Sequence, residues 1–384
     1  MRTPHRAAWL ATSLLAASAL AGPAKAAPEV VATVKPVHSL VSAVMDGVGT
    51  PRLLVEAGQS PHTYSLTPSD AGALEGADLV VWVGPSLESF LVRPVRNIAQ
   101  ESASFPLLHL DGLNLLRTRE GGAWEGHAHD HGSGGHDAHD HEDHDHDGHD
   151  HEEHAHEAEE AHGHEQDDPA AHDHADAHDH ADEHDHGHAH EAHAGEGHDH
   201  AGGEVQGIPE DELDPHVWLD PDNAQLILQA LADRLAELDP AHAETYQANA
   251  EAAVQRIAEL DATIAETIAP VQDVPYVVFH DAYHYFEQHY ATNAVGSITL
   301  SPERKPGAKR LTEVRDKITE LDARCVFREP QFAPDLVATV VENTQARIGT
   351  LDPLGVDHTA GPDAYPQTMR DLATDLRNCL SAQE

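Results

Sequence analysis

The sequence predicts an α/β fold built from two (β/α) domains with mostly parallel sheets, joined by one long rigid helix. Three observations support this prediction. Short β-rich runs alternate with longer helical stretches, several of the runs are apolar on both faces, and one uninterrupted helical stretch divides the alternation into two regions. A strand that is apolar on both faces needs helices on each side of its sheet, as in parallel α/β architectures.

The first alternating region begins at residue 29 and ends near residue 84. Its apolar, β-branched runs predict strands, and the stretches between them predict helices, the second of which is expected to be capped by Ser69. The expected strands are 30–34, 53–55 and 79–83, and the expected helices are 38–46 and 69–76.

A long helix is expected at 243–268, after a shorter helix from Pro221 to about Leu238 and a break at Asp239-Pro240. Apolar residues recur along it at helical spacing, and it contains neither Gly nor Pro. At 1.5 Å per residue it would be roughly 40 Å long, which is enough to run along two adjoining domains. The predicted apolar face comprises Tyr246, Ala250, Val254, Ile257, Leu260, Ile264 and Ile268.

The second alternating region follows Pro270. Its expected strands are 276–279, 325–327 and 348–351, and its expected helices are 307–321, 334–345 and 364–380. The predicted organisation is a signal peptide at 1–26, an N-terminal domain at 27–242 with an inserted loop at 127–204, a linking helix at 243–269 and a C-terminal domain at 270–384. Open α/β sheets bind ligands at the carboxyl ends of their strands, so the binding site is expected in a cleft between the domains.

The first residues predict export. A positively charged start precedes an apolar stretch at 7–21, and Ala24-Lys25-Ala26 has the small-x-small pattern of a cleavage site. The alternative is an uncleaved anchor, but the apolar stretch is shorter than the ~20 residues that a membrane span needs. The mature chain is therefore expected to begin near Ala27 and to be exported as a soluble protein.

A tract of histidines and carboxylates runs from His127 to His200. It holds 25 of the 35 histidines, and 26 Asp or Glu lie between Asp130 and Glu204. The formal net charge is −46, so removing these 26 negative charges leaves −20 for the rest of the chain. Such charge repels phosphate backbones and anionic lipids, so cations are the expected partners and nucleic acid is not.

The tract has almost no aliphatic or aromatic residues and is expected to be disordered, because it cannot bury enough apolar surface to offset the entropy of ordering. Its repeated His-Asp-His, His-Ala-His and His-Glu-Glu-His motifs suit transient, low-affinity zinc sites. A passive acidic spacer is the alternative, but it would not need 25 histidines. The accessory ligands are expected among His127, His129, His131, His139, His141, His144, His146, His149, His151, His178, His180, His184, His186, His188 and His190.

The chain has two cysteines, Cys325 and Cys379. In an oxidising compartment such a pair usually forms a disulfide, although two inert buried thiols would also fit the sequence. Two cysteines are too few for a thiolate metal site.

Three histidines stand where strand-like runs meet loops. His62 lies in a turn braced by Pro61, His216 lies in a second proline-braced turn before an apolar run, and His280 ends a predicted strand. Each alone could be an ordinary core or surface residue. Together they suit Zn²⁺, because imidazole nitrogen is a preferred zinc ligand and three of them plus one oxygen complete a tetrahedron.

Asp352 is the candidate for that oxygen, or for an outer-shell partner, because it ends the predicted strand 348–351 and precedes Pro353. Asp281 and Asp357 are weaker alternatives. Five further histidines of the folded part are expected to be structural or surface residues, namely His109, His242, His284, His289 and His358.

Four segments form a more specific pattern. They are Gln59-Ser60-Pro61-His62-Thr63-Tyr64-Ser65-Leu66, Asp214-Pro215-His216-Val217-Trp218-Leu219, Phe279-His280-Asp281-Ala282-Tyr283 and Thr350-Leu351-Asp352-Pro353-Leu354-Gly355. In this order, and with a histidine-rich insertion between the first two, they resemble the periplasmic zinc-binding proteins of bacterial ABC importers, the ZnuA type.

The resemblance implies two (β/α) domains bridged by a rigid helix, with one metal ion held between them by His62, His216 and His280. It implies zinc, because related manganese-binding members have a glutamate in the place of His280. The fourth position varies in this family and in some members is a glutamate just before the first histidine. Here that residue is Pro61, which leaves Asp352 or water as the fourth ligand, and Asp352 is the favoured one.

The resemblance also implies a disulfide between Cys325 and Cys379, and delivery of Zn²⁺ to a membrane ABC permease. The expected function is therefore capture of Zn²⁺ in the periplasm for import by a monomeric solute-binding protein, with no enzymatic activity. A zinc store or chaperone, in which the tract is the function, is one alternative. A zinc hydrolase is another, since three histidines with an open position can activate water, but the sequence has no His-Glu-x-x-His run.

Overall fold

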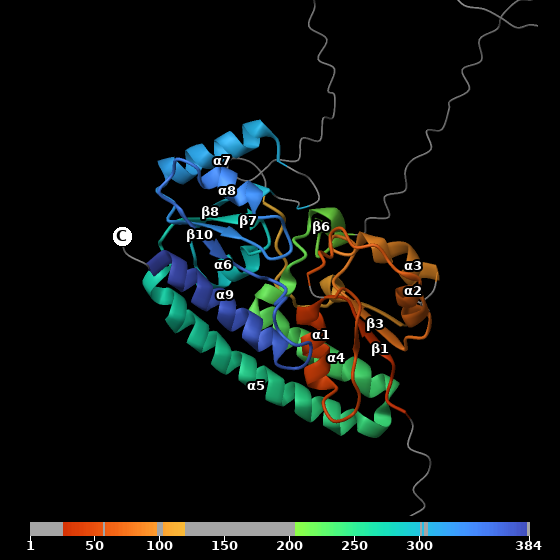
Figure 1. Ribbon diagram of the computed structural model, residues 1–384. Coiled ribbons are helices and arrows are strands. Elements are labelled where there is room, and N and C mark those ends of the chain that lie inside the picture. Colours follow the sequence, from red (N-terminus) through yellow and green to blue (C-terminus); the bar gives the residue numbers. More distant parts are fainter. Residues whose placement is uncertain are drawn as a thin grey trace, which may run out of the picture. The chain divides into compact units, whose positions relative to one another are not determined.

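Two four-stranded sheets organise the part of the chain that the structure describes (Figure 1). The computed structural model describes residues 26–56, 58–97, 103–119, 204–299, 302 and 306–381. All pairings within both sheets are parallel, which confirms the predicted α/β class. Nearly all of the predicted signal peptide and of the loop 127–204 lies outside the described residues, and so do the accessory loop histidines.

The N-terminal sheet has the strand order β2-β1-β3-β4. Its strands and the helices between them are β1 (Val30–Ala32), α1 (Lys35–Val44), β2 (Arg52–Leu53), α2 (Pro68–Glu75), β3 (Leu79–Trp82), α3 (Val92–Asn97) and β4 (Ser104–Pro106). The three predicted strands are present and slightly shorter than expected. The edge strand β4 adds to the prediction, because three residues ending in proline carry no strand pattern.

Helix α2 is capped by Thr67 and not by Ser69 as predicted. The Thr67 hydroxyl accepts the backbone N–H of Asp70 at 3.3 Å, and the Asp70 carboxylate accepts the backbone N–H of Thr67 at 2.9 Å. This reciprocal pair is a capping box, and it has Pro68 at the first helical position, where proline is favoured. Ser69 instead accepts a hydrogen bond from Arg52 at 3.2 Å.

The C-terminal sheet has the order β10-β9-β7-β8. Its elements are β7 (Tyr276–His280), α6 (His284–Tyr290), β8 (Ala294–Thr299), α7 (Ala308–Glu320), β9 (Cys325–Arg328), α8 (Asp335–Val341), β10 (Arg347–Thr350) and α9 (Ala364–Ser381). Helix α6 and strand β8 add to the prediction. Helix α8 ends before the predicted residue 345, because Glu342 is extended and Asn343 takes a left-handed conformation with φ of 63°.

The long helix α5 (Ala243–Ile268) has the bounds that its sequence predicts. It packs against α4 (Pro221–Leu238) and against α9, so it runs beside helices from both halves of the chain (Figure 1). Six of the seven predicted apolar-face residues are buried. The seventh, Val254, is only partly buried, and its neighbour Ala253 is buried instead.

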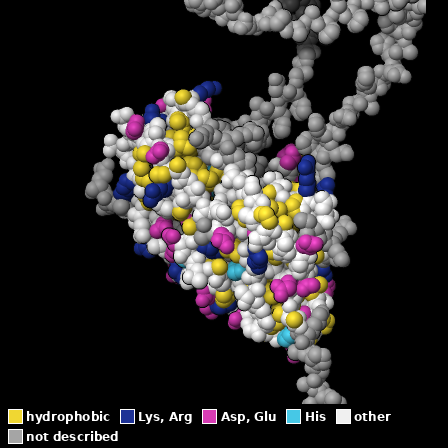
Figure 2. Space-filling view, turned by 45° about the vertical axis from the view of Figure 1, so that its right-hand side comes forward, with side chains coloured by type: hydrophobic (Ala, Val, Ile, Leu, Met, Phe, Trp, Pro, Cys, Tyr) yellow, Lys and Arg dark blue, Asp and Glu magenta, His cyan; other side chains and the backbone are white. Residues whose placement is uncertain are grey.

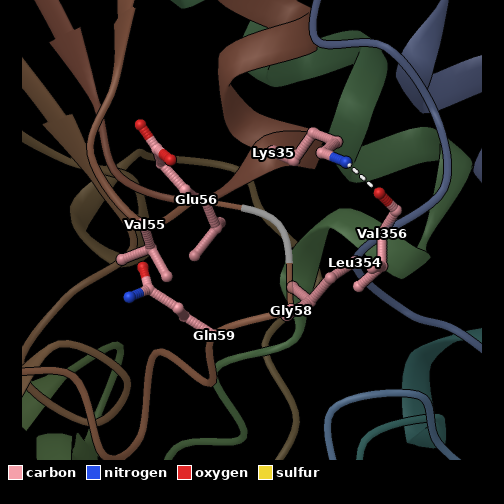
Figure 3. Close-up of a pocket in the computed structure, with 8 residues that line it drawn as sticks. Lys35, Val55, Glu56, Gly58, Gln59, Leu354 and Val356 are labelled. Atoms are coloured by element: carbon pink, nitrogen blue, oxygen red, sulfur yellow. Dashed lines mark hydrogen bonds between the residues drawn. The ribbon is translucent and has the colours of Figure 1, made fainter.

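A buried ammonium group also connects the two halves. Lys35, at the start of α1, donates from Nζ to the carbonyl oxygens of Gly355 at 2.7 Å, Val356 at 2.7 Å and His358 at 2.8 Å. Figure 3 shows the Lys35–Val356 contact at the rim of a small pocket that Leu354 also lines. Three carbonyls on one ammonium fix the segment after β10 against α1.

Cys325 and Cys379 form a disulfide that ties β9 to α9, as predicted. At the end of the predicted loop, residues 204–209 form a short antiparallel hairpin of β5 (Glu204–Val205) and β6 (Ile208–Pro209). Among the described residues, no helix is long and apolar enough to span a membrane.

Candidate metal centre

The three predicted histidines converge on one point. His62 lies in the turn between β2 and α2, His216 directly precedes a single 3₁₀ turn at Val217–Leu219, and His280 is the last residue of β7. One potential ligand atom from each lies within 4.8 Å of those of the other two. The ring centroids are 5.7 Å apart for His62 and His216, 5.6 Å for His62 and His280, and 5.3 Å for His216 and His280.

A carboxylate orients each of the two most buried imidazoles. His216 Nδ1 lies 2.8 Å from Asp214 Oδ1, and His280 Nδ1 lies 2.6 Å from Glu329 Oε1. These contacts leave both Nε2 atoms directed toward each other, 3.4 Å apart. A metal-binding histidine typically has one ring nitrogen bonded to a carboxylate and the other on the ion.

Burial favours neutral imidazoles at two of the three positions. Desolvation lowers the pKa of His62 and of His216 well below the ordinary histidine value, and the neighbouring imidazoles lower both further. Desolvation would also lower the pKa of His280, but the negative charge of Glu329 outweighs it, so that pKa is raised. Neutral nitrogen is the form that binds a metal ion.

The pocket around these nitrogens is small and mostly apolar. Besides the three histidines and Glu329, it is lined by Ser60, Pro61, Trp218, Gln331, Phe332, Pro353 and Leu354. His216 and His280 are only 4% and 3% exposed. On the face that Figure 2 shows, few histidine side chains are visible among the acidic and basic ones. Such a pocket excludes most water and strengthens electrostatic interactions within it.

Asp352 lies beside this pocket but is not part of the three-histidine group. Its carboxylate accepts the side-chain N–H of Gln331 at 2.8 Å and the backbone N–H of Leu354 at 3.1 Å, and it also bonds the backbone N–H of Val356. The carboxylate therefore shapes the turn after β10. Asp281, a weaker alternative for the fourth ligand, is bound to Arg119.

Sequence reasoning missed three residues around the centre. Asp214 lies two residues before His216 inside a quoted motif, and Glu329 follows β9 at the carboxyl end of the sheet, where ligands gather. Arg119, the last described residue before the long insertion, pairs with Asp281 and with Glu287 of α6. Arg119 carried no local signal, because its partners are 162 and 168 positions away.

The sheets and this cluster define an α/β binding protein with a nitrogen-rich candidate metal centre. Comparison with known families makes the class specific. The model of the ZnuA family, described as "Zinc-uptake complex component A periplasmic", matches residues 30–379. The chain belongs to this family.

The curated relatives support the same assignment. The "High-affinity zinc uptake system protein ZnuA" of Brucella suis biovar 1 (strain 1330) is 45% identical over 376 residues, which cover 97% of this chain and 98% of that protein. The protein of the same name from Yersinia pestis is 32% identical over 98% of this chain and 99% of its own.

Solved structures share the fold. "Crystal structure of ZnuA" has a TM-score of 0.60 at 17% identity and covers 92% of this chain and 99% of its own. "Crystal structure of 138-173 ZnuA deletion mutant plus zinc bound" has a TM-score of 0.61 at 18% identity and covers 93% of this chain and 100% of its own.

Proposed function

We propose that His62, His216 and His280 hold the Zn²⁺ ion that this zinc-uptake protein captures and delivers to a membrane ABC permease. The observation that carries the proposal is the convergence of three imidazole nitrogens within 4.8 Å at a buried point. The protein acts as a carrier, with Zn²⁺ as its cargo. As in its family, it works in the periplasm, to which the segment 1–26 directs it.

The donor set supports zinc over harder cations. Mg²⁺ and Ca²⁺ prefer oxygen ligands, whereas imidazole suits Zn²⁺ and its transition-metal neighbours. The carboxylates of Asp214 and Glu329 bond the Nδ1 atoms of two ligands, which increases the basicity of their Nε2 atoms and fixes their direction.

Water is the fourth ligand in this proposal. Asp352 would have to give up its contacts to Gln331, Leu354 and Val356 in order to reach the ion. A small molecule of solvent completes the tetrahedron without that cost, because Zn²⁺ accepts water readily beside three protein ligands.

The arrangement of the halves supports little hinge motion. Residues 27–242 and 270–384 serve as the two domains, with 243–269 as the link. Beyond the Lys35 contacts, Trp218 Nε1 donates to the carbonyl of Pro353 at 3.0 Å, and the hydroxyl of Tyr365 donates to the carbonyl of Trp218 at 2.9 Å. Release of the ion therefore requires the permease to disturb a pre-formed centre.

The test is a zinc titration of the full chain against a tight chelator, which masks the weaker loop sites. One tight site is expected, and the triple substitution His62→Ala, His216→Ala, His280→Ala should abolish it. His242→Ala, at a half-buried histidine that does not line the pocket, is the matched control and should retain the site.

A chain lacking 127–203 separates the import proposal from a zinc store. Retention of the tight site supports the three-histidine centre and leaves the loop as an accessory collector of lower affinity. Loss of all tight binding on deletion, or survival of the tight site in the triple variant, would assign the function to the tract instead.

A further inference from the structure

We propose a second metal site, formed by His289, Asp220 and Asp222, that takes a divalent transition-metal ion such as Zn²⁺. Among the described residues, two groups of histidine and carboxylate side chains bring one ligand atom each within 4.8 Å of one another. The three-histidine centre is one of them, and this group is the other. The proposal does not depend on the function of the first site.

Two separate helices build the site. Asp220 is the N-cap of α4, Asp222 lies in the first turn of that helix, and His289 lies in the last turn of α6. His289 Nδ1 lies 3.3 Å from Asp220 Oδ1. An imidazole and two carboxylates are a donor set that zinc and neighbouring ions accept.

The orientation of His289 is the main argument for a ligand role. Asp261, from α5, lies with Oδ1 at 2.9 Å from His289 Nε2, on the side of the ring away from Asp220. One ring nitrogen is thus held by Asp261 while the other lies beside Asp220, and an oxygen of Asp222 completes the group within 4.8 Å. The same arrangement holds His216 and His280 in the first centre, with Asp214 and Glu329 in the role of Asp261.

Asp220 is held in place as a ligand would be. It is buried, its Oδ1 accepts the backbone N–H of Asp222 at 2.9 Å, and its Oδ2 accepts the side-chain N–H of Asn114 at 3.1 Å. A carboxylate has about four acceptor positions, so these contacts leave room for an ion. Asp222 is exposed, and its carboxylate accepts a long hydrogen bond of 3.4 Å from the side chain of Gln225, so an ion has access from solvent.

A proton competes with the metal ion more strongly at His289 than at His62 and His216 of the three-histidine centre. The hydrogen bond to Asp220, together with Asp261, raises the pKa of His289 to about 9, and the ion must displace that proton from Nδ1. We therefore expect weaker binding than at the three-histidine centre, where two imidazoles are neutral. An ion here would join α4 of the N-terminal half to α6 of the C-terminal half.

The test is anomalous diffraction at the zinc edge from crystals of the full chain, grown over a rising zinc concentration. A peak is expected beside His289 Nδ1 at about 2.0–2.1 Å, the ordinary zinc–nitrogen distance, after the three-histidine centre has filled. His289→Gln and Asp222→Asn should each remove this peak and leave the first one. Asp261→Asn should reduce its occupancy without removing it.

Nitrogen-15 NMR of labelled histidines in solution is the second measurement. Zinc should shift the Nδ1 resonance of His289 in the wild-type chain but not in the Asp222→Asn variant. Absence of the peak with the first centre full, its persistence in His289→Gln, or a peak with no shift in solution would each overturn the proposal. A defect in the first centre removes a different peak, so the two proposals fail separately.

Discussion

Nε2 of His216 lies 3.4 Å from Nε2 of His280, and each of these rings is held from behind by its own carboxylate. Two imidazole nitrogens can lie 3.4 Å apart when one of them carries a proton and donates it to the other. The raised pKa of His280 and the lowered pKa of His216 place that proton on His280. A Zn²⁺ ion bound between them must replace it.

Zinc affinity should therefore fall as the pH falls. The zinc-free form holds a proton on His280 that the zinc-bound form lacks, so acid favours the zinc-free form. Below the pKa of His280 we expect the affinity to decrease by about tenfold per pH unit, the effect of one displaced proton. Chelator competition across pH 5 to 8 measures this, and an affinity independent of pH would contradict the shared proton.

Glu329→Gln should weaken zinc binding without removing the site. The amide can still accept from His280 Nδ1, but it lacks the charge that favours a bound cation and raises the basicity of the imidazole. Losses of about 10–100-fold are typical when such an outer partner is changed. Glu342→Gln, at an exposed glutamate, is the matched control and should bind zinc as the wild type does. Equal affinities for the two variants would show that Glu329 has no part in orienting His280.

Lys35→Met should destabilise the fold and loosen the pocket wall. The change leaves three carbonyls without their ammonium donor, and an unsatisfied buried acceptor costs about 1–3 kcal/mol. Because these carbonyls follow Pro353 and Leu354, which line the pocket, zinc affinity should also decrease several-fold. Urea unfolding and chelator competition measure the two effects. Lys309→Met, at a side chain that is 92% exposed, should change neither.

The disulfide should contribute roughly 4 kcal/mol to stability, because it closes a loop with a sequence separation of 54. The double substitution Cys325→Ala, Cys379→Ala should lower the free energy of unfolding by about that amount. It should leave the zinc affinity at neutral pH nearly unchanged, since neither cysteine lines the pocket. A large loss of affinity in the folded variant would show that β9, and with it Glu329, depends on this link.

The sequence predicts most of the fold because its signals are local. The uninterrupted apolar stripe of α5 and the paired cysteines need no knowledge of distant residues. Strand β8 and helix α6 could not be predicted, because β8 packs against β7 and α7, and α6 packs against the distant 3₁₀ turn at Val217–Leu219. Thr67 in place of Ser69 shows the same limit, since either residue could cap a helix and only the position of Pro68 separates them.

The candidate site divides in the same way. His62, His216 and His280 stand out because each follows a strand or a proline-braced turn. Asp214 and Glu329 could have been predicted to lie near the site, because one is two residues from His216 and the other directly follows a strand. Which imidazole nitrogen each carboxylate bonds could not be predicted. His289 carried no signal, because Asp220 and Asp261 approach it from two other helices. Such relationships arise only when the helices pack.

His289→Gln should destabilise the metal-free protein at low pH and not at high pH. The folded-state pKa of His289 is raised to about 9 from 6.5, chiefly by its hydrogen bond to Asp220. A raised pKa adds stability that is fully present below pH 6.5 and is lost as the pH rises through 9. The deficit of the variant should be about 1–2 kcal/mol at pH 6, allowing for solvent screening, and close to zero at pH 10.

Urea unfolding in the presence of a chelator, repeated across this pH range, measures the deficit of the His289→Gln variant. Gln288→Ala removes a neighbouring side chain that does not titrate, so any deficit it causes should stay constant with pH. A deficit of His289→Gln that is equally constant would mean that its imidazole is not charged between Asp220 and Asp261. The second metal site would then lose the proton competition that makes it the weaker of the two, and its zinc affinity should prove correspondingly higher at neutral pH.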